Sequence, residues 1–345
     1  MKRILYLDII RIFACICILI IHFNAAVCGW ELFGRFEYQN QLIPNFYFGT
    51  YLGEIGVGLF FIISGAGLYC GYDFNKLSKS NIINFYKKRA QALYPMYWIA
   101  FCLASVIHFL YYKSFSMANK FSIISSILGI DGYLGMMVQK YCGFYQVGEW
   151  FLGCIIIIYL LWPFLAYLLN KIPIILWGGI GVIYFLYIDK FSYNLFLFQL
   201  PYLMFGYCFM KYIKTAKNIK VWIGVLLLLL SRFLFNDSLH YFAKAIILDL
   251  FLFLLLALLV ESFCNNLNEN KIKVIALMST VTYPMFLIHH KFINIITDMY
   301  DLQHFPYRYT LILFFIYIIS VYLMSIKLKK CTDYVIKVWL CKGVN

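Results

Sequence analysis

Three ionisable side chains lie in an N-terminal segment that is otherwise apolar. Residues 5–27 contain Asp8, Arg11 and His22 among isoleucine, leucine, phenylalanine, alanine and cysteine. A charged group near the centre of a bilayer costs about 2.5 to 3.5 kcal/mol even on lenient insertion scales, so such residues indicate a functional site. In a helix, Asp8 and Arg11 can pair on one face. His22 follows Arg11 by eleven residues, about three turns, so both point the same way about 16 Å apart.

Two adjacent histidines, His289 and His290, end the motif Tyr-Pro-Met-Phe-Leu-Ile-His-His at residues 283–290. They lie about 16 residues from the expected cytoplasmic end of the apolar segment 274–297, at about the same depth as His22. An imidazole gains and loses a proton near neutral pH. Adjacent histidines inside a membrane segment are hard to explain as core packing, so they too indicate a functional role.

Three further features could take part in chemistry, and each also has a plain structural explanation. Glu149 directly precedes the apolar segment 150–169. The dipole of the helix that begins there stabilises a carboxylate, so capping of this helix is the structural explanation. Ser64 belongs to a Ser-Gly pair, which permits close approach of a backbone, either from another helix or from a ligand. The basic residues Lys88 and Arg89 could bind an anionic donor such as a nucleotide, although membrane topology alone also explains a basic run.

Composition places these residues in a membrane protein. The 345 residues are 64% hydrophobic and 13% charged, with a mean hydropathy of +0.81, whereas apolar residues make up about half of a soluble domain. We therefore predict an all-α, polytopic integral membrane protein. Apolar runs of about 20 residues, the length that spans a bilayer, predict about ten transmembrane helices at 5–27, 51–72, 92–112, 150–169, 172–188, 193–210, 219–235, 241–261, 274–297 and 309–327. No signal-peptide cleavage site follows the first run, so we expect the first helix to remain.

The net charge of +14 does not indicate a nucleic-acid partner, because the basic residues recur in short clusters between apolar runs. These clusters fall on the side of the N-terminus, which predicts that both termini are cytoplasmic. They comprise Lys76, Lys79, Lys87, Lys88, Arg89, Lys211, Lys214, Lys217, Lys220, Lys327, Lys329 and Lys330. We expect residues 1–330 to form one transmembrane domain and residues 331–345 a short basic cytoplasmic tail. Residues 121–130 are amphipathic but too short to span, so we expect them to lie at the interface or to re-enter.

The cysteines do not predict a disulfide framework. Most of the eleven lie inside apolar segments, where cysteine packs as a small apolar residue. Cys15 and Cys17 point to different faces of the first helix and cannot form a metal pair on their own. We therefore predict no metal ligand and no bound cofactor.

Five motifs along the chain share their residues and order with one known family. They are the opening segment 3–11 with its Arg-x10-His spacing to His22, Phe-Phe-Ile-Ile-Ser-Gly at 60–65, the basic run leading into Tyr-Pro at 85–95, Trp-Phe-Leu at 150–152, and the motif at 283–290. The chain thereby resembles acyltransferase family 3, membrane O-acyltransferases that acylate sugars of bacterial surface polysaccharides and some small molecules. Two positions depart from the family pattern: Ala92 replaces a frequent second Arg, and Ala66 replaces a common Phe.

The resemblance implies transfer of an acyl group, acetyl in the simplest case, from cytoplasmic acyl-CoA to a hydroxyl of an extracytoplasmic or lipid-linked glycan. His22 would then deprotonate the sugar hydroxyl. Arg11 would hold a donor phosphate, polarise the thioester carbonyl or pair with Asp8. His289 or His290 could be the base instead, with His22 only bonding a neighbouring helix. The implied location is the bacterial plasma membrane, among lipids.

The remaining implied roles concern the donor and the reaction path. Lys88 and Arg89, with Ser64, would contact acyl-CoA, and Glu149 would join the catalytic residues. A covalent route would need a nucleophile, for which His22 and Ser64 are the candidates; direct transfer is the other route.

A transporter or exporter of a polysaccharide or lipid-linked sugar is the alternative class, because intramembrane ionisable residues also line permeation paths. Dependence on an acyl donor separates the two. An enzyme consumes acyl-CoA and leaves an ester on its product, whereas a transporter moves an unmodified solute.

Overall fold

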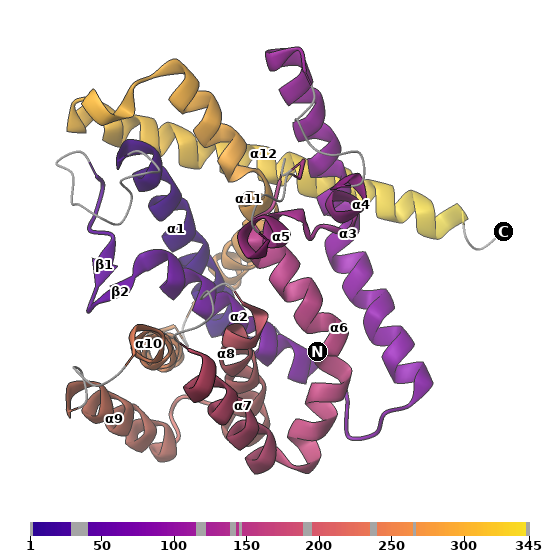
Figure 1. Cartoon of the computed structure of the whole chain (residues 1–345), viewed down its shortest axis with the longest axis vertical. Helices are drawn as coiled ribbons and strands as arrows, with labels where there is room; N and C mark the ends of the chain where they lie inside the picture. The colour runs from indigo at the N-terminus through magenta and orange to yellow at the C-terminus, as the bar shows by residue number, and fades with distance from the viewer. Residues whose placement is uncertain are drawn as a thin grey trace. The chain divides into compact units, whose positions relative to one another are not determined.

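Helices make up nearly all of the described chain (Figure 1). The computed structural model describes residues 3–28, 41–114, 122–138, 143–144, 147–188, 195–234, 240–264 and 267–342. Within these ranges the one sheet is a hairpin in which β1 (Phe46–Tyr47) pairs antiparallel with β2 (Thr50–Tyr51). The prediction of an all-helical membrane protein is confirmed.

Seven of the described helices are long and apolar enough to cross a membrane. They are α1 (Leu5–Cys28), α2 (Leu52–Gly71), α3 (Lys79–Tyr112), α6 (Trp150–Lys171), α10 (Tyr241–Phe263), α11 (Glu269–Met299) and α12 (Tyr307–Lys342). Each contains or closely matches one predicted span. α3 begins before the predicted span because its basic first turns are also helical, and α12 continues from the last span into the predicted tail.

The other three predicted spans coincide with shorter helices. These are α7 (Pro173–Tyr187, 15 residues), α8 (Phe196–Cys208, 13 residues) and α9 (Ile219–Leu234, 16 residues). A five-residue π-helix, η1 (Phe209–Ile213), continues α8. At 1.5 Å per residue, α7 and α9 fall short of a hydrocarbon core of about 30 Å, whereas α8 and η1 together run from Phe196 to Ile213. The count of ten spans and the cytoplasmic placement of both termini therefore stay predictions.

The remaining helices are short. They are α4 (Ser122–Leu128), α5 (Asp131–Met137) and the 3-10 turn η2 (Leu302–His304). In α4, Ser122, Ser125 and Ser126 are buried while Ile124 and Ile127 are exposed. A short helix in the segment 121–130 is thus confirmed for its described residues, and its interfacial position stays a prediction.

The chain divides into two compact units. The first unit comprises Met1–Ile18, Phe46–Ile82 and Leu161–Thr280, and the second comprises Leu19–Asn45, Ile83–Leu160 and Val281–Asn345. α1, α6 and α11 each contribute residues to both units.

In the first unit, α2 packs closely against α8. A Cβ added to Gly65 would lie 1.9 Å from the backbone oxygen of Leu203, and one added to Gly206 would lie 1.9 Å from that of Ile62. Two small residues therefore let the backbones touch, as in membrane helix pairs. The close approach predicted for the Ser-Gly pair is made, at Gly65, by a helix.

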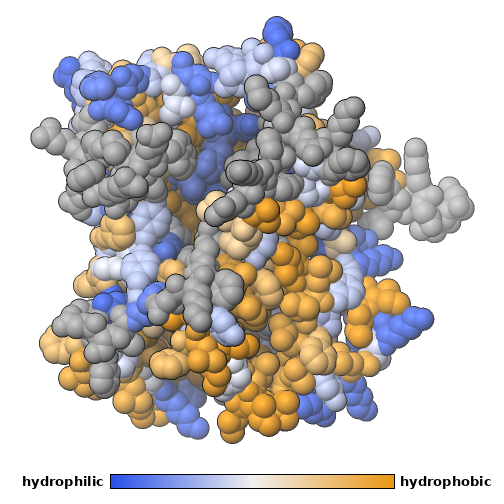
Figure 2. Space-filling model, viewed as in Figure 1, coloured by the Kyte–Doolittle hydropathy of each residue, from blue (hydrophilic) through white to orange (hydrophobic). Residues whose placement is uncertain are grey.

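Apolar side chains also cover much of the outside, as the face in Figure 2 shows. α7 buries none of its side chains, and Ile174 and Phe185 in it are 86% and 83% exposed. Tyr184 of the same helix packs against Phe198 of α8, and the exposed hydrophobic face is suited to contact with lipid.

Candidate functional site

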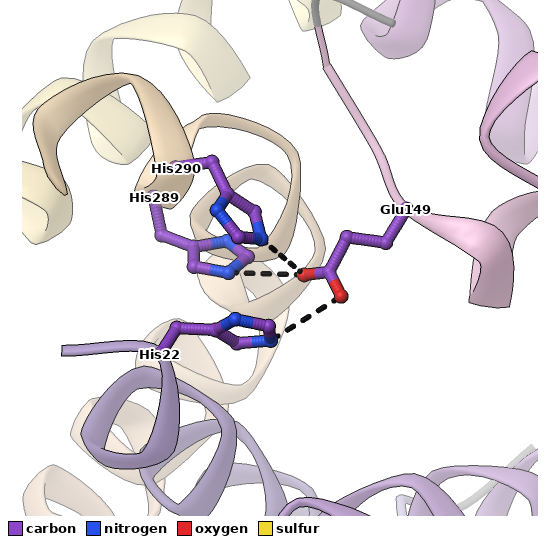
Figure 3. A group of neighbouring side chains, drawn as sticks. All are labelled: His22, Glu149, His289 and His290. Atoms are coloured by element: carbon purple, nitrogen blue, oxygen red, sulfur yellow. Dashed lines mark ion pairs between the residues drawn. The ribbon is translucent and has the colours of Figure 1, made fainter. Parts of the chain in front are cut away.

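Four predicted site residues meet in the second unit. Figure 3 shows His22 from α1 and His289 and His290 from α11 pointing at Glu149, which directly precedes α6. The Nε2 atom of His22 lies 3.2 Å from Oε2 of Glu149. The Nε2 atoms of His289 and His290 both lie 3.1 Å from Oε1. We call these four residues the His/Glu centre.

Local packing places the Glu149 carboxylate where α6 begins. Gly148 has a φ of +75°, in the left-handed region that favours glycine. A Cβ there would also lie 3.1 Å from the Leu152 side chain. Phe151 then packs edge to face against Phe286, with ring centroids 5.4 Å apart. The start of α6 is thereby held against α11, one turn from its histidines.

α11 holds its two histidines differently. The Nδ1 atom of His289 lies 2.7 Å from the backbone oxygen of Phe286 one turn earlier, and the residue is fully buried. His290 keeps 23% of its side chain exposed, and its ring lies 4.4 Å from that of His22, centroid to centroid. The His22 side chain is 18% exposed. The centre therefore has an enclosed side at His289 and a more open side at His22 and His290.

The carboxylate links the three rings. The side chain of Glu149 is 9% exposed, and the Nε2–H group of His22 donates to its Oε2 atom over 3.2 Å. The helix cap that the sequence suggested is thus a partner of histidines. Such a group can orient an imidazole, accept a proton through it, or share a metal ion with it.

The first unit contains a second polar group, around Asp8 in α1. This carboxylate is 4% exposed and accepts a hydrogen bond of 2.6 Å from Ser279. Arg11 donates to it over 3.4 Å and to Ser279 over 3.0 Å, as the predicted pairing requires. Arg3 pairs with the same carboxylate and donates to the Ala276 carbonyl over 2.8 Å. The sequence placed Arg3 in the opening motif at residues 3–11 and did not predict this contact.

The predicted donor contacts are divided between the units. The Ser64 hydroxyl, in the first unit, donates to the Phe60 carbonyl of its own helix over 2.8 Å. Lys88 and Arg89 lie in the second unit, where the Arg89 guanidinium lies 5.8 Å from the centre of the Tyr159 ring. None of these contacts tests binding of a donor.

Two acidic residues of the first unit, a half-buried Glu54 and a fully buried Asp249, were not among the predicted site residues. Tyr241 at the start of α10 donates a hydrogen bond to Glu54 of α2. Asp249, also in α10, is fully buried, and a Cβ added to Gly58 would lie 2.1 Å from its Oδ2. A lone Asp in an apolar run is itself the signal that could have predicted it.

A cavity of about 440 Å³ lies beside the end of α11 in the second unit. Most of its lining residues have polar side chains. The lining residues are Ala26, Thr297, Asp298, Met299, Tyr300, Asp301, Leu302 and Gln303. Ala26 lies one turn beyond His22 on α1. The cavity is therefore close along that helix to the His/Glu centre.

Helices long and apolar enough to cross a membrane, together with a cluster of three histidines and one glutamate, characterise the described part of the chain as a multi-pass membrane protein with a polar centre. A family model described as an acyltransferase domain matches residues 4–327. The chain belongs to acyltransferase family 3 and is a membrane acyltransferase. Searches of curated proteins and of solved structures each gave no match.

Proposed function

We propose that this protein transfers an acyl group, acetyl in the simplest case, from acyl-CoA to a hydroxyl of an extracytoplasmic or lipid-linked glycan in the bacterial plasma membrane. The observation that carries the proposal is the contact of 3.2 Å between His22 and a carboxylate that is itself almost buried. A histidine oriented by a carboxylate is the usual form of a general base in acyl transfer.

The ring nitrogen that accepts the hydroxyl proton follows from this contact. When Nε2–H of His22 donates to Glu149, the neutral ring has its lone pair on Nδ1. That lone pair takes the hydroxyl proton as the oxygen attacks the thioester carbonyl, and the imidazolium is stabilised by the carboxylate. The carbon–sulfur bond then breaks, and the proton passes from the ring to the leaving thiolate. The products are an ester and free CoA, so no covalent acyl-enzyme is needed.

The cavity next to the end of α11 supports a sugar as the acceptor. Its lining offers the carboxylates of Asp298 and Asp301 and the amide of Gln303, groups that hydrogen-bond to hydroxyls. The His304 ring lies 2.7 Å from Asp301, and this hydrogen bond lowers the pKa of that carboxyl. Asp301 therefore stays ionised and accepts hydrogen bonds from sugar hydroxyls.

Cationic side chains support a multiply phosphorylated donor. Arg11 and Arg3 share one carboxylate in the first unit, and Lys88 and Arg89 lie at the start of α3 in the second. Guanidinium groups form short, charge-assisted hydrogen bonds with phosphate oxygens. We propose each pair, Arg3 with Arg11 and Lys88 with Arg89, within its own unit, as a candidate phosphate-binding group for acyl-CoA.

The base is tested by measuring acetyl-CoA consumption and ester formation by purified protein in detergent. We expect His22→Gln to lower turnover by about two to four orders of magnitude, the contribution of a positioned general base. Its thermal midpoint should stay near that of the wild type. His108→Gln, a change in α3 outside the His/Glu centre, is the matched control and should retain its rate.

His290→Gln, assayed beside it, addresses the second candidate base. A large loss of turnover in His290→Gln with near-normal turnover in His22→Gln would assign the base to His290 instead. Mass spectrometry of surface glycans from cells with and without the gene tests the acceptor. Loss of a substituent of about 42 Da, an acetyl group, is expected, whereas transport of an unmodified glycan without donor consumption would contradict acyl transfer.

A further inference from the structure

The tautomer of His289 follows from its surroundings. A backbone carbonyl can only accept, so the 2.7 Å contact with Phe286 requires a proton on Nδ1 of His289. The neutral ring then has a lone pair on Nε2. That lone pair lies 3.1 Å from Oε1 of Glu149, which is also an acceptor.

Two acceptors at this distance repel unless something positive lies between them. Both atoms are fully buried, and among the described residues neither has a hydrogen-bond partner in good geometry. A second proton on His289 would make a buried imidazolium. A metal ion is the other solution, because neutral imidazole and ionised carboxylate are both metal ligands.

The donor atoms are arranged as a metal site requires. One ligand atom from each of His22, Glu149, His289 and His290 lies within 4.8 Å of all the others. Zinc bonds of about 2.0 to 2.2 Å in a tetrahedron place ligand atoms about 3.3 to 3.6 Å apart. The three contacts of 3.1 to 3.2 Å, two to Oε1 and one to Oε2 of Glu149, are close to these distances. A metal-bound histidine also usually donates its second N–H to a backbone carbonyl, as His289 does.

We propose that the His/Glu centre binds one divalent transition-metal ion, of which Zn²⁺ is the best match, and that the bound ion inhibits acyl transfer. Three imidazoles and one carboxylate are a ligand set typical of zinc. The sequence predicted no metal ligand because these residues come from three distant segments. Inhibition rests on the proposed function. When His22 and Glu149 both bind the zinc ion, the His22 ring is no longer free to take a hydroxyl proton.

The first test measures binding without any reaction. Purified protein is stripped with a chelator, dialysed against Zn²⁺ and assayed for bound zinc per chain; Co²⁺, whose visible absorption reports its coordination, is the second probe. We expect one ion per chain in the wild type and in the control His108→Gln. Loss of a group that hydrogen-bonds to a metal ligand costs about 10- to 100-fold in metal affinity. Loss of a ligand itself, in His289→Ala or Glu149→Gln, should therefore lower zinc affinity by at least about 100-fold.

The second test adds Zn²⁺ to the acyl-transfer assay, and turnover should fall over the same concentrations that load the centre. His290→Gln should bind more weakly and need more zinc for the same loss, which keeps the test open if His289→Ala does not fold. Equal zinc binding by wild type and all ligand variants, or none, overturns the metal site and leaves the proposed base untouched. Specific binding with unchanged or higher turnover overturns the inhibition and the role of His22 as base.

Discussion

The Asp8 carboxylate is shared by two guanidinium groups, from Arg3 and Arg11. One negative charge cannot balance two positive charges, so this part of α1 keeps a net positive charge. The side chain of Asp8 is 6% exposed, whereas those of Arg3 and Arg11 are 45% and 34% exposed. The buried acid thus orients two partly accessible cations, an arrangement that favours a further anion.

Arg11→Gln should therefore weaken the binding of CoA. A hydrogen bond to a charged group contributes about 1.5 to 3 kcal/mol, which corresponds to about 10- to 150-fold in affinity. Isothermal titration of purified protein with CoA measures the change, and Arg89→Ala tests the basic run of α3 in the same way. Lys329→Gln, which removes an exposed cation paired with Asp333 in α12, is the control for net charge. Unchanged affinity in Arg11→Gln would remove this residue from the donor site.

Sequence alone identified every member of the His/Glu centre, because ionisable groups stand out in apolar segments. It did not show that one carboxylate contacts all three rings. Glu149 is more than 100 residues from both His22 and His289 along the chain, and such contacts depend on helix packing that no local pattern encodes. The contact of Arg3 with the Ala276 carbonyl was missed for the same reason: the partner lies on another helix.

At the scale of elements, the contact between α2 and α8 depends on two glycines. Each lies against a backbone oxygen of the other helix, so neither position has room for a methyl group. The Ser-Gly pair predicted close approach but left open whether a helix or a ligand made it. The partner glycine, Gly206, lies in α8, which η1 continues to Ile213.

Gly65→Ala should destabilise the protein. Overpacking a tight contact costs about 1 to 3 kcal/mol, so we expect a clearly lower thermal midpoint in detergent. Gly67 lies two residues further along α2 with open space at its Cβ position. Gly67→Ala should therefore be neutral or stabilising by up to about 1 kcal/mol, since alanine is the better helix former. Equal midpoints for the two variants would contradict the close contact.

At the scale of the whole molecule, hydropathy predicted the helical membrane class and most spans well, since apolar length is a local property. α7 and α9 agree with their predicted runs 172–188 and 219–235 to within one residue at each end. Apolar length therefore located these helices but did not separate short helices from full spans. Orientation rests on the basic clusters alone.

Labelling with a membrane-impermeant maleimide tests that orientation. Lys76→Cys, between α2 and α3, should react only after the cells are permeabilised, because the basic cluster is predicted to be cytoplasmic. Asp301→Cys, in the exposed turn between α11 and α12, is the matched outer position and should react in intact cells. The native cysteines that react are first replaced. Labelling of Lys76→Cys in intact cells would reverse the predicted topology.

The bare surface of α7 has a consequence for how this sequence can diverge. Ile174, Ile175, Val182 and Phe185 are exposed, so within the described residues no packing distinguishes leucine from isoleucine, valine or phenylalanine at these positions, whereas Tyr184 packs edge to face against Phe198 of α8. Drift at the exposed positions is limited by affinity for hydrocarbon. Two related chains can therefore differ there and still share the same site, whereas a single change at Gly65 or Glu149 removes a close helix contact or the partner of three histidines.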